Sequence, residues 1–239
     1  MMLLLAVAYN TLVVLTGVSL LGACAGVVGC FAVLRRRSLT GDALAHAALP
    51  GLCLAYLIVG QREREPMLFA ALATGLLGIA LIAALRRWTR VKEDAAIGVV
   101  LSFFGVGVVL LSVIQGLPGG ARAGLQSYNL GQTAGLTRED VAFIGGLALL
   151  TVLVVLVLYK EFKLITFDQG FARVQGWPAL RLDLALMGLI ALVVVLGLPA
   201  VGVLLVAALL IVPAAAARFW TQRLWLMLML SAGFKATRA

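Results

Sequence analysis

The chain has 239 residues, of which 63% are hydrophobic and 12% are charged, whereas an average soluble domain is about half apolar and about a quarter charged. This composition identifies an integral membrane protein and excludes a separate soluble catalytic domain, because spans of about 20 apolar residues use up most of the chain. The net charge of +9 lies at the ends of apolar runs, which indicates membrane topology and no nucleic-acid partner.

Apolar runs separated by charged residues predict seven spans and the start of an eighth. Backbone groups in lipid must be hydrogen-bonded within their own segment, and the alternating pattern of barrel strands is missing, so the spans are expected to be helices. The predicted fold is an all-α, polytopic transmembrane helical bundle of seven to eight spans. The spans lie near 10–34, 42–60, 67–85, 95–114, 141–159, 183–198 and 200–217, with the eighth beginning at Leu224.

The two ends of the chain lead to different expectations. The N-terminal stretch MMLLLAVAYN has no basic residue before its apolar run, so we expect it to remain as the lead-in to the first span. After Ser231 the sequence AGFKATRA abandons the apolar pattern, as a truncation or an altered reading frame would. We therefore expect a single transmembrane domain over residues 1–239, with an incomplete C-terminal part.

The basic residues predict the orientation of the chain. Counted by loop, 13 Lys and Arg residues lie in the odd-numbered loops, including the end of the seventh span, and 4 lie in the even-numbered loops. By the positive-inside rule, the odd loops are cytoplasmic and the N-terminus lies outside. The one long outer loop, 115–137, is rich in glycine and is expected to be irregular. It could contact an external partner or serve only as a connection.

The strongest chemical signal lies at the start of the second span. The segment RRRSLTGDALAHAALPG places Asp42 four residues before His46, the only histidine of the chain. At this spacing both side chains share one helix face, about 6 Å apart along the axis. A carboxylate and an imidazole suit zinc or manganese, and polar residues at membrane depth indicate function. Two alternatives stay open at this point: a helix cap at Asp42 with a hydrogen-bonded histidine, or a proton relay.

One chain supplies only two ligands from this pair. A complete site would need water molecules, a backbone carbonyl such as the one freed near Pro50, or a second copy of the chain across a two-fold axis. The second copy would contribute another aspartate and another histidine.

The fifth loop contains the stretch TFDQGFARVQGWP at 166–178. Asp168 is in the position of a helix N-cap, and a short amphipathic helix is expected to follow it and to end before Gly176 and Pro178. A partner protein could bind such a helix on the cytoplasmic side. The helix could equally rest on lipid headgroups.

Several enzyme signatures are absent from the sequence. It contains no GxxxxGK[ST] phosphate loop and no HExxH motif, so ATP hydrolysis by that route and zinc-protease chemistry are not expected. An intramembrane enzyme that uses Asp42 and Asp94, both near the inner face, is the first alternative function. A passive channel or scaffold is the second.

Four sequence blocks together resemble the membrane-spanning subunits of ABC importers for manganese, zinc and iron. They occur in the order of that family and cover most of residues 20–220. The blocks are RRRSLTGDALAHAALPG at 35–51, KEDAAIGVVLSFFGVGVVLLS at 92–112, YKEFKLITFDQGFARVQGWP at 159–178 and AVGVLLVAALLIVPAAAAR at 200–218.

The resemblance implies a permease of the bacterial cytoplasmic (inner) membrane that works as a dimer with a second copy or a paralogue. Cytoplasmic ATPase subunits would hydrolyse ATP, and an extracytoplasmic metal-binding protein would deliver the cargo, a divalent manganese, zinc or iron ion. No permanently bound cofactor is expected. The motif GDxLxHxxLPG places the family's metal path at Asp42 and His46. The block TFDxxxAxxxG places the ATPase-coupling segment at Phe167, Asp168, Ala172 and Gly176.

Overall fold

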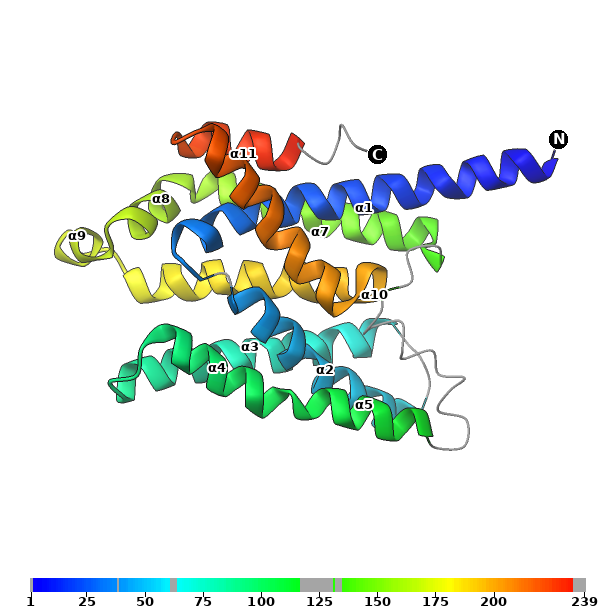
Figure 1. Ribbon diagram of the computed structural model, residues 1–239, viewed down its shortest axis with the longest axis horizontal. Coiled ribbons are helices and arrows are strands. Elements are labelled where there is room, and N and C mark those ends of the chain that lie inside the picture. Colours follow the sequence, from blue (N-terminus) through cyan, green and yellow to red (C-terminus); the bar gives the residue numbers. More distant parts are fainter. Residues whose placement is uncertain (1, 38, 61–63, 117–130, 132–134, 234–239) are drawn as a thin grey trace. The chain divides into compact units, whose positions relative to one another are not determined.

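The structure is a computed structural model that describes residues 2–37, 39–60, 64–116, 131 and 135–233. Within these residues every regular element is a helix, which confirms the all-α prediction (Figure 1). In chain order the helices are α1 (Met2–Leu34), α2 (Leu39–Val59), α3 (Arg64–Trp88), α4 (Glu93–Phe104), α5 (Val106–Gly116), α7 (Arg138–Val157), α8 (Tyr159–Phe167), α9 (Gln169–Val174), α10 (Ala179–Trp220) and α11 (Leu224–Gly233).

In the described part of the chain, six helical stretches are long and apolar enough to cross a membrane. The fourth stretch joins α4 and α5, which meet at Gly105 with little change in backbone conformation. A shorter apolar helix, α11, begins at Leu224, where the eighth run was expected. The helices coincide with the apolar runs of the sequence and confirm a polytopic membrane protein. The outward orientation of the N-terminus remains a prediction.

Helix α10 contains both the sixth and the seventh predicted spans. Gly202 interrupts it with φ 80° and ψ 167°, a conformation that glycine adopts without the steric cost paid by other residues. The interruption divides α10 into the stretches 179–201 and 203–220. Hydropathy placed the break at Pro199, and the structure places it close by, at the glycine.

The chain forms two compact units, each described here by itself. The first unit comprises residues 1–36, 132–189 and 208–239. In it α1 packs against α7, α8 and α11. Phe31 and Phe162, both fully buried, meet edge to face with ring centroids 5.8 Å apart, and the Cys30 thiol lies 3.1 Å from the Ser231 hydroxyl oxygen. Helix α1 is therefore the packing centre of this unit.

The second unit comprises residues 37–131 and 190–207. Helix α2 is its centre and packs against α3, α4 and α5. The backbone of α5 lies directly against Pro50 of α2, since a Cβ atom added to Gly107 would come within 2.5 Å of the proline Cδ atom. The helix that carries Asp42 and His46 is thus held in a closely packed setting.

Two expectations fall on parts of the chain outside the described residues. Most of the outer loop 115–137 is one of them, so its irregular structure and its contact with an external partner stay predictions. The tail 234–239, on which the expectation of an incomplete C-terminal part rests, is the other.

Candidate functional site

Asp42 and His46 lie one turn apart on α2, and the structure brings their side chains together. The Nε2 atom of His46 is 3.8 Å from Oδ1 of Asp42. Helix α2 begins at Leu39, so Asp42 sits inside the first turn, where the helix dipole favours a negative charge. The alternative in which Asp42 caps this helix is therefore wrong.

The distance between the two side chains also decides how they interact. At 3.8 Å the imidazole and the carboxylate are too far apart for a hydrogen bond, whose donor and acceptor lie about 2.7–3.2 Å apart. A cation bound to both atoms at about 2.1 Å would hold them roughly 3–4 Å apart. The spacing thus matches two ligands of one ion better than a histidine hydrogen-bonded to its neighbour.

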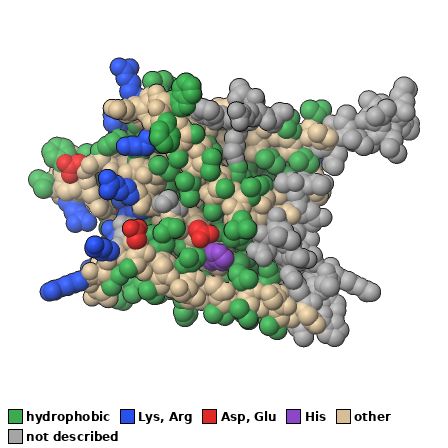
Figure 2. Space-filling model, in the orientation of Figure 1, with side chains coloured by type: hydrophobic (Ala, Val, Ile, Leu, Met, Phe, Trp, Pro, Cys, Tyr) green, Lys and Arg blue, Asp and Glu red, His purple; other side chains and the backbone are tan. Residues whose placement is uncertain are grey.

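The imidazole of His46 is also incompletely satisfied. Its Nδ1 atom is buried and has no hydrogen-bond partner among the described residues, which is costly for a polar atom. The side chains of His46 and Asp42 are 23% and 32% exposed, and Figure 2 shows this histidine at the surface beside an acidic side chain. The pair can therefore be reached from outside the chain.

The described residues contain no group of three or more His, Cys, Asp or Glu side chains that could hold a metal ion. Asp42 and His46 can therefore offer two ligands, and we call this pair the candidate metal half-site. A further oxygen lies nearby in the sequence, because Pro50, inside α2, has no N–H to bond the carbonyl group four residues earlier, which is that of His46. Water or a second copy of the chain must supply the remaining ligands.

Asp94, the second carboxylate of the enzyme alternative, has a different setting. It is the second residue of α4 and is exposed. An exposed acid in a first helical turn is explained by the helix dipole alone. Nothing in its surroundings distinguishes it as a catalytic group.

The block 166–178 contains the end of α8, the single residue Asp168, the short helix α9 and a turn at Gln175 and Gly176. Asp168 is the N-cap of α9 and accepts a hydrogen bond from the Phe171 backbone N–H at 2.8 Å, which confirms the predicted cap. Gly176 follows the helix with φ 80°, the left-handed conformation that ends helices. The four sequence-predicted residues thus follow one another around α9: Phe167 ends α8, Asp168 caps α9, Ala172 lies within α9 and Gly176 follows it.

This element buries one side and exposes apolar side chains on the other. Ala172 is fully buried, whereas Phe167 is 60% and Val174 is 86% exposed. The basic residues Lys163 and Arg173 are exposed beside them. An exposed apolar face edged with positive charge fits a partner protein or the lipid headgroup region, and geometry alone leaves both open.

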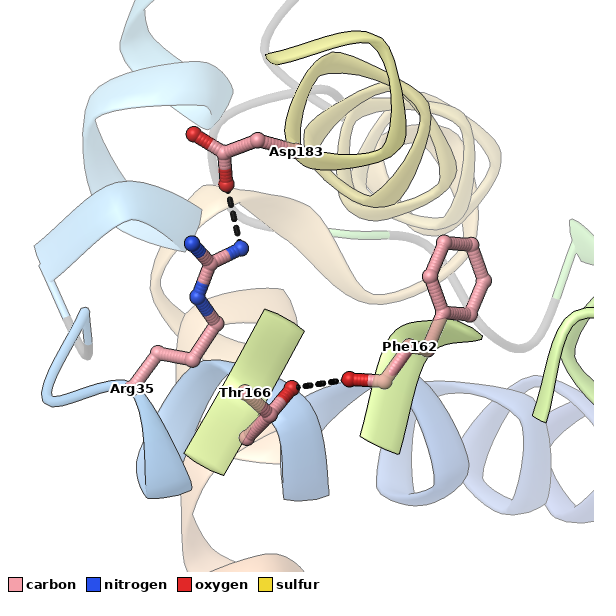
Figure 3. A network of polar contacts seen from close by, with 4 residues as sticks. All are labelled: Arg35, Phe162, Thr166 and Asp183. Atoms are coloured by element: carbon pink, nitrogen blue, oxygen red, sulfur yellow. Dashed lines mark hydrogen bonds and ion pairs between the residues drawn. The ribbon is translucent and has the colours of Figure 1, made fainter. Parts of the chain in front are cut away.

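A buried ion pair was not anticipated from the sequence. Arg35, at the end of α1, pairs with Asp183 of α10, and both side chains are almost completely buried (Figure 3). From the sequence, the basic cluster that contains Arg35 indicated only topology, and no motif distinguished Asp183. The available clue was an acidic residue at the first position of an apolar run, since such residues are rare at membrane depth and are paired there.

Comparison with known proteins gives one family and several relatives. The sequence model of the ABC 3 transport family matches residues 8–237. The manganese transport system membrane protein MntC of Bacillus subtilis is 48% identical over 223 residues, which are 93% of this chain and 51% of that protein. The zinc transport system membrane protein TroC of Treponema pallidum is 43% identical over 222 residues, 92% of this chain and 74% of that protein.

A solved structure, PsaBC from Streptococcus pneumoniae in complex with Fab, has a similar fold. It superposes with a TM-score of 0.79 at 32% sequence identity, covering 94% of this chain and 78% of that one. The chain spans about half the length of the Bacillus subtilis relative and about three quarters of the Treponema pallidum relative.

Proposed function

The chain belongs to the ABC 3 transport family, and on this basis we propose that it is the transmembrane subunit of an ATP-driven importer for a divalent transition metal. It is a multi-pass protein of the cytoplasmic membrane, and we take residues 1–239 to act as one permease domain. The observation that carries the metal assignment is the pair Asp42 and His46, spaced at 3.8 Å as two ligands of one ion are.

Family membership supports a transport subunit and gives no support to an intramembrane enzyme based on Asp42 and Asp94. It also favours ATP-driven transport over a passive channel. ATP hydrolysis is placed on separate cytoplasmic subunits, in agreement with the missing phosphate loop in this sequence. The relatives named for manganese and zinc make these two ions the first candidates for the cargo, and iron follows from the sequence resemblance only.

Asp42 and His46 contribute different properties to the proposed metal path. The carboxylate of Asp42 supplies negative charge, which makes entry of a divalent cation into a low-dielectric region less costly. The imidazole of His46 adds a nitrogen ligand that magnesium and calcium disfavour. Two protein ligands from one chain hold an ion only weakly.

A second permease, either a copy of this chain or a paralogue, completes the site in this proposal. Two half-sites would offer two carboxylates and two imidazoles, enough for the four-coordinate geometry of zinc. An extracytoplasmic binding protein delivers the metal from the outer side. The exposure of Asp42 and His46 on this chain supports a site that another subunit shares.

The coupling role belongs to the segment around α9. Exposed Phe167 and its apolar neighbours form the face that docks on an ATPase subunit, while buried Ala172 holds the helix against the rest of its own unit. Asp168 and Gly176 fix the two ends of α9 through the cap and the left-handed turn. The segment can then move as one body when the ATPase moves.

The test is transport in liposomes that contain the permease, its ATPase and its binding protein. Metal loaded on the binding protein should accumulate inside only when ATP is present, and manganese, zinc and iron are compared side by side. Asp42→Ala should abolish accumulation of the transported ion, whereas Asp94→Ala, an exposed acid at the start of another helix, should leave it unchanged. ATP-independent accumulation, or full transport by Asp42→Ala, would refute the proposal.

A further inference from the structure

The buried ion pair joins Arg35, at the end of α1, to Asp183 of α10, the helix that follows the coupling segment in the chain, and α2 is the next helix after Arg35. We propose that these two positioning residues are the mechanical link that passes movement of the ATPase-docking segment to α2. This inference rests on the proposed function. It concerns residues that touch neither the metal nor the ATPase, and it uses three separate stretches of the chain.

The first stretch runs from α9 to Asp183, and consecutive backbone hydrogen bonds hold it. The Trp177 N–H donates to the Ala172 carbonyl oxygen at 3.0 Å, and the Ala179 N–H donates to the Trp177 carbonyl oxygen at 2.7 Å. The Leu182 N–H then donates to the Pro178 carbonyl oxygen at 3.1 Å, closing the first turn of α10. A displacement of α9 is therefore passed on to the first turn of α10, which directly precedes Asp183.

The second stretch runs from Arg35 to α2. The backbone N–H of Arg35 still bonds the Phe31 carbonyl oxygen at 3.0 Å, so this residue continues the last turn of α1. Arg36 follows with φ 58° and is the one non-glycine residue with positive φ in the described part of the chain, a conformation that costs free energy. The chain passes from the first unit to the second at this residue, and α2 begins at Leu39. Only three residues of the chain separate Arg35 from Leu39, the first residue of α2.

The third stretch shows why the ion pair is the sensitive link. Helix α8, which precedes α9, is tied to the end of α1 by the Phe31–Phe162 ring contact. The Thr166 hydroxyl donates to the Phe162 carbonyl oxygen at 2.6 Å within α8 (Figure 3). The coupling segment is therefore fastened to the end of α1 on both sides, by rings before it and by charges after it. Ring contacts can slide and repack, whereas a guanidinium–carboxylate pair has a preferred direction.

Stability alone does not account for this pair. A buried ion pair pays for the desolvation of both charges, and replacing it with apolar residues of similar size is often neutral or stabilising. Coupling between distant sites, in contrast, can be carried by ion pairs and packed side chains that have discrete arrangements. Fold stability and coupling can therefore be separated by experiment.

The experiment uses the complete transporter in liposomes, with its ATPase and its binding protein, and measures metal ions imported per ATP hydrolysed. Arg35→Met combined with Asp183→Leu removes both charges and retains apolar bulk. We expect this variant to assemble and to hydrolyse ATP, and its import per ATP to fall by about tenfold. Exchange of the charges, Arg35→Asp with Asp183→Arg, should restore at least half of the wild-type ratio.

Three comparisons make the outcome decisive. Arg181→Gln removes an exposed charge two residues from Asp183 and should leave the ratio unchanged. Asp183→Asn retains size and hydrogen bonding, so its import per ATP decides the matter if the apolar pair assembles poorly. A wild-type ratio in the apolar pair or in Asp183→Asn would overturn the link while the proposed function stands. Failure of the wild-type transporter to import metal would overturn the proposed function itself.

Discussion

The metal half-site on α2 and the coupling segment around α9 are built in opposite ways. On α2 a polar pair stands in a closely packed apolar helix, and one buried nitrogen of His46 has no hydrogen-bond partner among the described residues. Around α9 the backbone is satisfied locally, by the Asp168 cap and by the turn at Gly176. What remains uncovered there is a set of apolar side chains, of which Val174 is the most exposed.

This difference indicates what each region needs from outside. In the proposed function, the α2 pair offers only two ligands, so an ion and a second set of ligands complete it. The α9 segment lacks only a surface to cover its apolar face, so a protein partner or lipid completes it. Changes on α2 should therefore act on metal handling with little effect on folding, and changes around α9 should act on coupling.

The largest effect is expected from His46→Gln. Glutamine can hydrogen-bond to Asp42 but is a poor ligand for zinc or manganese, so ATP-driven uptake should fall at least about 100-fold, the upper end of what loss of an outer-shell partner alone costs. The melting temperature of the purified permease should stay the same, because the buried nitrogen of His46 has no hydrogen bond to lose. Uptake is measured in liposomes and stability by thermal unfolding in detergent.

The same variant can contradict the proposed difference between α2 and the segment around α9. If His46→Gln transports at the wild-type rate, the histidine is structural and α2 does not carry the metal path. If it loses stability together with uptake, the two regions do not differ in the way proposed.

A smaller effect is expected from Gly176→Trp. Space around this glycine is open, but its φ of 80° strains any other residue, at a cost of about 1–2 kcal/mol. The end of α9 should shift, so that import per ATP falls by about tenfold while the permease stays in the membrane and ATP hydrolysis continues. Gln175→Trp places the same bulk one position earlier, at a residue with ordinary helical backbone, and should couple normally. Unchanged uptake in Gly176→Trp would argue against the coupling role.

Local features of both regions could be predicted from the sequence. Apolar runs and caps depend on neighbouring residues, so the positions of the spans and the Asp168 cap agree with the structure. The spacing of Asp42 and His46 predicted their shared helix face for the same reason. Even the break in α10 was expected within a few residues, although hydropathy could not tell that Gly202, and not Pro199, adopts the unusual backbone.

Features that depend on distant residues could not be predicted. Arg35 and Asp183 are separated by 148 positions, and nothing in the local pattern says that they meet. The start of α2 at Leu39 was also missed, because the hydropathy of the run does not reveal that Asp42 lies within the first turn. Completeness of the metal site depends on groups that one chain does not contain.

The packing behind the metal half-site is tested by Gly107→Ala. A Cβ atom here would come within 2.5 Å of Pro50 Cδ, so α5 must shift away from α2 at a cost of about 1–3 kcal/mol. We expect a lower melting temperature in detergent. Gly98→Ala is the matched control, because a Cβ atom there meets nothing within 4 Å and alanine is the better helix former. Equal melting temperatures for the two variants would show that the setting of α2 is less closely packed than described.

The smallest effect is expected at the helix cap, and it separates hydrogen bonding from charge. Asp168→Ala removes the bond that the carboxylate accepts from the Phe171 N–H and should destabilise α9 by about 1 kcal/mol. Import per ATP should fall about fivefold, the factor that such a free energy represents. Asp168→Asn retains the acceptor oxygen and removes the charge, so it should couple almost normally. Hydrogen exchange of the α9 amides measures the loss of the cap independently of transport. If Asp168→Asn impairs coupling as strongly as Asp168→Ala while the α9 amides stay protected, the charge of Asp168 acts on the partner directly. The structure of the segment then depends less on its own hydrogen bonds, and its coupling more on the partner, than the comparison with α2 indicates.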